Sequence, residues 1–521
     1  MPTTWTISIN WDRDGGFTEP YDNVTSRTLS ADWFLGFQTL YLDTADNSKL
    51  QLILDNSDKR FSPENGGSPI ARKVRPFVPV RIQSNDGTTL RTHWVGWIET
   101  IQPDVNQFGQ RRVTITAAGP MLFFKAAETD IDLQINQRTD VIINTLLDQV
   151  VIPPPLTGAW YLHEDGANIA NISPINIWYQ LGTNTYLADP RTQRSLDIGE
   201  VTLALAADNW VARDREKDTK FSIYRAIADV VAAERGRFYF NREGRAIFWN
   251  RSKLQYAVIP SPSVTLNNEM VDMTYSYAST DNDFKNEINV TCHPRTLSVE
   301  LDAILWKVKK PITIAPGKAQ KIEVSYRDKD ATDARIGGIN VYYNDVVFSS
   351  GTATIKLEAK ANSATLILKN SGGANAVLSG LTLRGQKITD FGELEAESVS
   401  TASIAMYGQR TLAMNLLSIE EVKYAQKVAD FEIIRRGLPR GLVKQVTLKS
   451  HGKNGGSFHA DQLSQTIGGI VIITENQTTH TNQSYLIIGE AHKLTASATL
   501  LETTWYLEPV TVGSFSWVLD A

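Results

Sequence analysis

The sequence predicts a mainly β protein with a few helices, organised as a multi-domain α+β chain. Polar and apolar residues alternate over many short stretches, such as 78–83 and 112–116, which is the pattern of half-buried strands. Gly, Asn and Asp punctuate these stretches, and only three segments have helical spacing. At 521 residues the chain also exceeds one core, so we expect about three or four domains of roughly 150 residues each.

The strands begin near the amino terminus and include recognisable hairpins. Residues 4–9 alternate like a strand directly after the first few residues. Asp86-Gly87 predicts a hairpin turn between a strand at Arg81-Ile82 and one at Trp94-Val95. Residues 238–248 predict a second hairpin.

Three helices are expected. The first covers about 138–149, with an apolar stripe that includes Ile142 and Leu146. The second starts at a Ser222 N-cap and stops at Gly236. The third starts at a capping box, in which the hydroxyl of Ser418 and the carboxylate of Glu421 satisfy free amide donors.

The third helix carries its own buried stripe and stop signal. The stripe consists of Val422, Ala425, Ala429 and Ile433, and the helix ends at Gly437. All three helices have a purely structural explanation.

Punctuation divides the chain into four expected domains. These are an N-terminal β domain at 1–130, an α+β helix-hairpin domain at 131–300, a β-sandwich at 301–391, and a C-terminal domain at 392–521 with the capped helix and a second β unit. Residues 78–120 and 469–509 have a faintly similar pattern, which we call the echo. Each contains a predicted strand with a glycine in it, at Gly96-Trp97 and Gly489-Glu490, followed by a second strand. Two similar small β-barrels or chance explain this echo equally well.

Composition limits the function. The formal net charge of −5 disfavours a surface built for nucleic-acid phosphates or anionic lipid. Cys292 is the only cysteine, which excludes an internal disulfide and thiolate-rich metal sites; we expect it to be buried on a strand. The start lacks a signal-peptide pattern, and no apolar run is long enough to span a bilayer. We therefore expect a soluble protein made in the cytoplasm.

No catalytic constellation appears in the sequence. The seven histidines form no metal-binding pair at helical spacing; His451 and His459 flank a Gly-rich loop that we interpret as polar surface. Carboxylate pairs such as Glu395 and Glu397, or Asp130 and Asp132, are common in a chain with 57 acidic residues. We predict no enzymatic activity, no cofactor and no metal.

Four aromatic residues form a candidate binding surface. They could grip a sugar or a protein partner, although core or interface packing is the commoner role for such residues. The residues are Trp160, Tyr161, Trp178 and Tyr179.

One segment resembles a known family. Residues 54–65 read LDNSDKRFSPEN and are followed by Ser68-Pro69 and a Pro79-Val80-Arg81 strand. This resembles a segment of minor tail proteins of tailed phages: a strand, an Asx turn, a Pro-fixed loop and a return strand. Its candidate interface residues are Asp55, Asn56, Arg60, Phe61, Pro63 and Asn65. Residues 221–250 and 403–410 are similar to the helix-hairpin and hub portions of the same proteins.

The resemblance implies a structural virion protein, namely a baseplate-hub or tail-associated protein at the distal tail tip. Such hubs are homotrimers in which each chain gives two tube-like β-barrels, and the sandwich is similar to their inserted decorating domain. The implied partners are further copies of the chain, the distal tail protein, the tape-measure protein and a tail fibre or receptor-binding protein. The implied role is host attachment and genome delivery, without sequence-specific nucleic-acid binding.

Three alternatives remain open. A hexameric distal tail ring protein would carry a single barrel per chain. A carbohydrate-binding tail-tip module would depend on Trp160 and Trp178. A wall hydrolase would need a catalytic part for which the family offers no matching position here.

Overall fold

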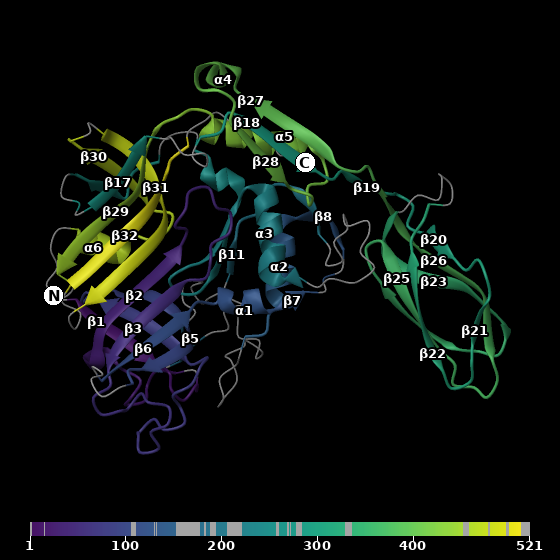
Figure 1. Cartoon of the computed structure of the whole chain (residues 1–521), viewed down its shortest axis with the longest axis horizontal. Helices are drawn as coiled ribbons and strands as arrows, with labels where there is room; N and C mark the ends of the chain where they lie inside the picture. Colours follow the sequence, from purple (N-terminus) through teal and green to yellow (C-terminus); the bar gives the residue numbers. More distant parts are fainter. Residues whose placement is uncertain are drawn as a thin grey trace.

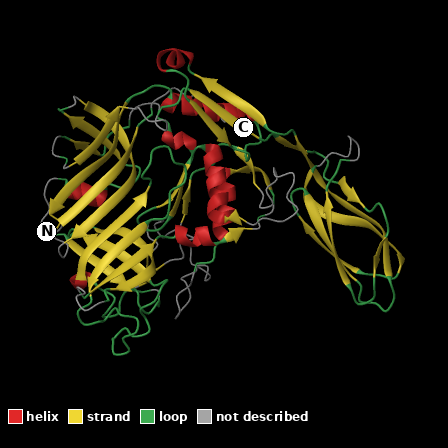
Figure 2. Cartoon of the chain, in the orientation of Figure 1, coloured by secondary structure: helices red, strands yellow, loops and turns green. Residues whose placement is uncertain are grey.

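The computed structural model describes most of the chain. The residues described are 3–14, 16–105, 111–129, 131, 133–152, 178–181, 184–187, 194–205, 221–256, 260–267, 270, 272–277, 284–328, 336–451, 458–477, 480–495 and 500–511. Strands dominate, with short helices between them (Figure 2). The predicted mainly β, multi-domain α+β class is confirmed.

The two ends of the chain share one twelve-stranded sheet. Its N-terminal half runs in the order β1 (Thr4–Ile9), β4 (Pro79–Asn85), β5 (Leu90–Pro103), β6 (Arg112–Ala118), β3 (Lys49–Asp55) and β2 (Thr28–Gly36). Its C-terminal half continues with β31 (His480–Thr495), β32 (Leu500–Pro509), β29 (Gly441–His451) and β17 (Asp272–Tyr277), while β30 (Ile470–Glu475) and β16 (Val264–Leu266) extend from β31.

The echo between the two ends has a structural counterpart. Residues 79–118 form the antiparallel meander β4-β5-β6, and residues 470–509 form the meander β30-β31-β32. The predicted hairpin across Asp86-Gly87 is confirmed, and in it Arg81 pairs with Val95. The predicted barrels are not: among the described residues no sheet closes on itself, and the two units are halves of one continuous sheet.

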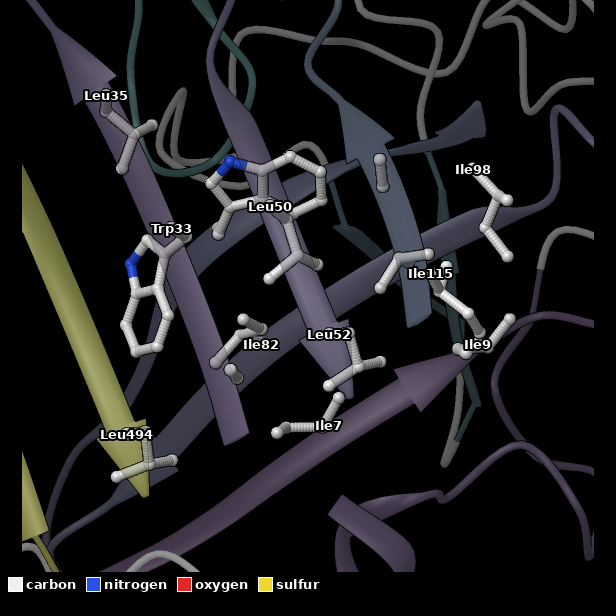
Figure 3. Packing of buried hydrophobic residues seen from close by; sticks show 14 of the residues in the cluster. Ile7, Ile9, Trp33, Leu35, Leu50, Leu52, Ile82, Ile98, Ile115 and Leu494 are labelled. Atoms are coloured by element: carbon white, nitrogen blue, oxygen red, sulfur yellow. The ribbon is translucent and has the colours of Figure 1, made fainter. Parts of the chain in front are cut away.

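The N-terminal half-sheet curls over an apolar core. Figure 3 shows Ile7 of β1 and Ile82 of β4 facing Leu52 of β3, and all three side chains are at most 1% exposed. Burying each such side chain contributes about 1.5–3 kcal/mol. Leu494 of β31 belongs to the same core, so the C-terminal half completes the packing of the N-terminal one.

A helical middle part packs beside the joined sheet (Figure 1). Its helices are α1 (Met121–Ala126), α2 (Thr139–Asp148) and α3 (Ile223–Glu234). Its short strands pair as β7 (Glu128–Thr129) with β13 (Phe221–Ser222), β8 (Gln134–Arg138) with β12 (Thr202–Leu205), β9 (Trp178–Leu181) with β10 (Asn184–Leu187), and β11 (Arg194–Leu196) with the hairpin β14 (Arg237–Phe240) and β15 (Ala246–Trp249). A 3-10 turn, η1, spans Thr25–Arg27, and another, η3, spans Arg251–Leu254.

The helices and the hairpin predicted for this part are present. Helix α2 matches the first expected helix, and the Ser222 hydroxyl accepts a hydrogen bond from the Arg225 amide at 3.3 Å, as an N-cap does. Arg235, which has the left-handed conformation, ends α3 directly before Gly236, where a stop was predicted.

A three-stranded sheet covered by helix α5 (Val422–Arg436) forms the next part of the fold. Strands β27 (Leu394–Val399), β18 (Glu287–Cys292) and β28 (Thr411–Asn415) form this sheet, and α4 (Thr401–Tyr407) precedes β28. Cys292 is buried at the end of β18, as predicted. Helix α6 (His459–Ser464) lies against β29.

The predicted capping box is wrong. Helix α5 starts at Val422 with Glu421 as its N-cap, and no side chain caps it. Leu417 and Ser418 form a turn instead, Ile419 bridges Leu203, and the Glu420 side chain accepts a hydrogen bond from the Asn136 amide at 3.1 Å. These long-range contacts override the local signal. Ala425 and Ala429 are buried as expected, whereas Val422 is exposed and Ile433 only half-buried; Gly437 ends the helix.

The β-sandwich projects as an arm (Figure 1). One sheet pairs β26 (Ala376–Asp390) with β19 (Arg295–Leu297), β20 (Ala303–Lys307), β21 (Ile312–Ile314) and β23 (Gly337–Ser350), and the other consists of β22 (Ala319–Ser325), β25 (Ser363–Lys369) and β24 (Thr354–Ala359). Its core, with Leu366 and Leu383, is separate from the others. A small apolar cluster of Ile135, Ala204 and Ile388 joins the arm to the middle part.

Candidate assembly surface

The family-like segment follows β3 and folds as a self-bonded loop. The Asn56 side chain accepts from the Phe61 amide at 2.9 Å and donates to the Ser62 hydroxyl at 3.1 Å. The Asp55 carboxylate accepts from the Ser57 amide at 3.1 Å, and the Asn65 amide group donates to the Lys59 carbonyl at 2.9 Å. The Asx turn expected from the sequence is therefore present.

The same loop is anchored from within and exposed at its tip. Phe61 is fully buried and stacks on Trp11, with ring centroids 5.8 Å apart. Arg60 lies over the Tyr21 ring and contacts Asp58 at 3.3 Å. Pro63 is exposed. Of the predicted interface residues, Asn56 and Phe61 thus shape the loop, while Asp55, Arg60, Pro63 and Asn65 are partly or fully accessible.

The predicted aromatic surface falls mostly outside what can be described. Trp160 and Tyr161 lie outside the described residues. Trp178 and Tyr179 belong to β9, which pairs with β10, but their side chains also lie outside the described part.

The two half-sheets meet at a seam, which we define as the antiparallel pairing of Ser30–Gly36 in β2 with Gly489–Thr495 in β31. Strand β31 changes partners along its length: its first part pairs with β30 and its second part with β2. The Gly36–Gly489 pair ends the seam. A Cβ on Gly489 would lie 2.2 Å from the Phe37 carbonyl oxygen, so only glycine allows this approach.

The outer face over the seam is hollowed. A cavity of about 460 Å³ lies there, and both apolar residues such as Phe34 and charged residues such as Lys49 and Glu502 line it. We call the accessible part of this lining the seam face; it consists of Asp32, Phe34, Lys49, Gln51, Glu99, Thr116, Ala491, Lys493, Glu502 and Thr504, while Trp33, Leu50, Ala117 and His492 border the cavity but are buried.

A buried arginine cluster ties the seam region to the helices. It brings together the β2–β3 loop, the end of α3, helix α5 and the end of β32. Its members are Arg235, Arg237, Arg435, Arg436, Asp43, Glu432 and Glu508.

Glu432 is the centre of this cluster. Its carboxylate lies 2.9 Å from Arg235 Nε, 3.1 Å from Arg435 Nη1 and 2.7 Å from Arg436 Nε, and the side chain is fully buried. Burial alone would raise the pKa of Glu432, but these guanidinium groups outweigh it and lower the pKa to about 2. Asp43, which pairs with Arg235, is held differently: burial raises its pKa to about 6 against the pull of Arg235.

Glu508 links the cluster to both ends of the chain. It accepts from Arg435 Nη2 at 2.8 Å, pairs with Arg237, and accepts from the Tyr41 amide at 3.0 Å. One carboxylate at the end of β32 therefore fixes α5, the β14–β15 hairpin and the β2–β3 loop.

A second buried pair clamps the seam itself. Arg242, in the β14–β15 turn, donates from Nε and Nη2 to Glu490 of β31, both at 2.6 Å. Its remaining donors reach the carbonyls of Leu463 at 2.8 Å and Gln465 at 2.6 Å. Four hydrogen bonds thus use four of the five donors of the buried guanidinium, a forked pattern that Arg supplies and Lys could not.

Sequence reasoning missed these ion pairs. The pairs that join different parts of the chain, such as Arg235 with Glu432 or Arg242 with Glu490, lie far apart in sequence, so spacing does not reveal them. A local signal did exist: Arg235 and Arg237 interrupt an apolar run from helix to strand, and Glu432 lies between Phe431 and Ile433. Charges embedded in apolar runs are buried only with partners.

Candidate chemistry is sparse in the described part of the chain. No group of three or more His, Cys, Asp or Glu side chains gathers there as metal ligands. His459 is engaged by Thr3 at 3.0 Å and Ser450 at 2.9 Å. Glu395 and Glu397 share β27 as expected and are exposed, whereas Asp130 and Asp132 lie outside the described residues. Within the same limits, no helix is long and apolar enough to cross a membrane.

Sequence comparison finds no match among protein-family models and none among curated proteins. Structure comparison finds similarity to a tail protein from Neisseria meningitidis, with a TM-score of 0.47, 8% identity, and coverage of 98% of this chain and 100% of that one. A 43 kDa tail protein of prophage MuSo2 from Shewanella oneidensis follows, with a TM-score of 0.42, 9% identity, and coverage of 97% and 98%.

A type VI secretion component from Escherichia coli, described as structurally similar to the tail proteins gp27 and gp5 of bacteriophage T4, is also similar. Its TM-score is 0.34 at 8% identity, with coverage of 95% of this chain and 77% of that one. At these scores the likeness is distant.

Proposed function

We propose that this chain is a structural hub of a phage-type tail tip that assembles as a homotrimer. The observation that carries the proposal is the seam: one chain supplies two half-sheets, each built on a three-stranded meander and joined edge to edge by β2 and β31. Three such chains supply six similar units, which match a sixfold ring of the distal tail protein. The family-like loop at 55–65 supports the same assignment.

The seam face supports an orientation within this ring. It is hollowed and lies over the joint between the two units, so it is suited to the inward side of a ring. Its charges nearly balance, with Asp32, Glu99 and Glu502 against Lys49 and Lys493. A surface without excess positive charge lets a phosphate backbone pass without binding it. In this orientation the distal tail protein lies above the hub, the tape-measure protein within, and a fibre or receptor-binding protein below.

The oligomeric state tests the core of the proposal. We expect native mass spectrometry of the chain, alone and with the distal tail protein of the same tail, to give a mass of about 174 kDa, three times the 57.9 kDa of one chain. Six copies in a ring would instead support the distal-ring alternative, which needs one unit per chain. A chain that stays monomeric with its partner present would refute both.

Thiol accessibility tests the orientation of the seam face. Cys292 is buried, so a new surface cysteine is the only readily accessible thiol among the described residues. We expect Gln51→Cys, on the seam face, to react with a bulky polyethylene-glycol maleimide as a monomer but not in assembled tails. Thr352→Cys, exposed on the arm, should react equally in both. Equal labelling of Gln51→Cys in both states would place the seam face outside the ring.

A further inference from the structure

Two histidines lie buried together where the half-sheets meet. His93 belongs to β5 in the N-terminal half and is fully buried, and His492 belongs to β31 and is 4% exposed. Their ring centroids are 6.2 Å apart. Trp33 of β2 stacks on His492, with centroids 5.0 Å apart and planes inclined by 18°. We call His93 and His492 the imidazole pair.

The hydrogen bonds of His93 and His492 are compatible with neutral imidazole rings. His93 Nε2 lies 2.7 Å from the Ser84 hydroxyl, and His492 Nδ1 lies 3.0 Å from the Thr503 hydroxyl. Both partners are hydroxyl groups, which bond either tautomer of a neutral ring. The other nitrogen of His93 is buried and has no hydrogen-bond partner among the described residues, so a proton there would be left unsolvated.

The surrounding charges also oppose protonation. Arg242, Arg91 and His459 all add positive potential at His93. Glu490 is the nearby carboxylate, 3.5 Å from His492 Nε2, but Arg242 already holds both of its oxygens at 2.6 Å. Burial first, and then these charges, lower the pKa of His93 well below its ordinary value; burial also lowers that of His492, against the pull of Glu490.

We infer that the imidazole pair makes the seam an acid-sensitive joint, at which protonation of His93 and His492 separates β2 from β31. Two imidazolium rings with centroids 6.2 Å apart would add positive charge close to Arg242, which already binds both oxygens of Glu490. Opening the seam lets water reach both rings. The inference concerns a joint within one chain, so it holds whether or not the chain is a tail hub.

The direction with pH follows from the lowered pKa values. The open seam binds protons at the ordinary imidazole value of about 6.5, while the closed seam does not, so the closed state loses stability as pH falls below that value. Each histidine contributes up to about a tenfold change in the opening equilibrium per pH unit. Asp43 with a pKa of about 6, and Asp22, Glu234 and Glu420 with pKa values of about 7, oppose this trend in global stability because their protonation favours the folded state.

A local measurement therefore tests the inference. Hydrogen exchange followed by mass spectrometry would be compared at about pH 7.5 and about pH 5.5, either side of the ordinary imidazole value, after correction for intrinsic rates. We expect peptides covering 28–36 and 486–495 to lose protection about tenfold or more at the lower pH. The arm peptide 363–369 should keep its protection.

Glutamine variants identify the groups responsible. His93→Gln with His492→Gln keeps a hydrogen-bonding side chain at each hydroxyl and removes the proton site, so we expect the pH dependence at the seam to disappear. His451→Gln changes an exposed ring and should leave it intact. A seam in the unchanged protein that is equally protected at both pH values, or a double variant that opens like the unchanged protein, would overturn the inference.

Ring titration covers the case of a double variant that does not fold. In the unchanged protein, NMR of histidine-labelled chain should show two rings that stay neutral until seam protection is lost. Two buried rings that titrate at the ordinary value while the seam stays protected would also overturn it.

Discussion

Replacing Glu432 by glutamine removes the negative charge at the centre of the arginine cluster. Glutamine keeps the shape of the side chain, so the change leaves no cavity. Arg235, Arg435 and Arg436 then lose the carboxylate that all three contact within 3.1 Å. The remaining acids, Asp43 and Glu508, lie at the edges of the cluster.

Two routes give the magnitude. Removing one partner of a buried ion pair costs about 3–5 kcal/mol, because the other charge stays buried without compensation. Independently, a pKa of about 2 instead of the ordinary 4.5 corresponds to roughly 3 kcal/mol of stability from Glu432 at neutral pH. Since the pKa is lowered, this contribution is present above about pH 4.5 and is lost as pH falls towards 2.

Urea unfolding followed by hydrogen exchange measures the effect where it occurs, because a multi-domain chain does not unfold in one step. We expect Glu432→Gln to lower the opening free energy of α5 peptides by about 3 kcal/mol or more and to leave the arm unchanged. Glu395→Gln, an exposed carboxylate on β27, is the matched control and should change neither. A Glu432→Gln protein within about 1 kcal/mol of the original would refute the account of the cluster as a net stabilising joint.

Two further substitutions test the seam and the family-like loop. Gly489→Ala places a Cβ 2.2 Å from the Phe37 carbonyl oxygen, so it should destabilise the seam by roughly 1–3 kcal/mol in thermal unfolding. The control Gly373→Ala has open space around it and should not change the melting temperature. Equal melting temperatures for the two variants would contradict the close approach at Gly489. Phe61→Ala removes a buried ring stacked on Trp11, so it should lower the local stability of the loop by about 3–5 kcal/mol. We expect faster proteolysis within residues 55–78. An unchanged cleavage rate would mean that the loop is held by its hydrogen bonds alone.

The sequence predicted those parts of the fold that depend on neighbouring residues. Helix α3 between the Ser222 cap and Gly236, and the hairpin across Asp86-Gly87, follow from local signals and are present. The capping box at Ser418 failed because Ser418 lies in a turn, while long-range contacts from Leu203 and Asn136 hold Ile419 and Glu420.

The candidate site was predicted less completely, for a related reason. The Asn56 and Phe61 loop is local, and its turn chemistry could be anticipated. The seam and the arginine cluster depend on partners such as Gly36 with Gly489, or Asp43 with Arg235, whose encounter is set by the whole topology. The echo between the two segments was explained equally well by chance, and nothing in the sequence indicated that the ends pair with each other.

The pairing of β2 with β31 has a consequence for the synthesis of the chain. Strand β2 ends at Gly36 and its partner residues in β31 begin at Gly489, so this edge of β2 has no native partner until the residues up to β31 have been made. At translation rates of about 5–20 residues per second, that delay is on the order of half a minute to a minute and a half. During that time an unpaired edge beside Trp33 and Leu35 is open to association with other nascent chains. High expression levels should therefore favour aggregation through this edge, and slower, cooler expression should increase the yield of folded protein.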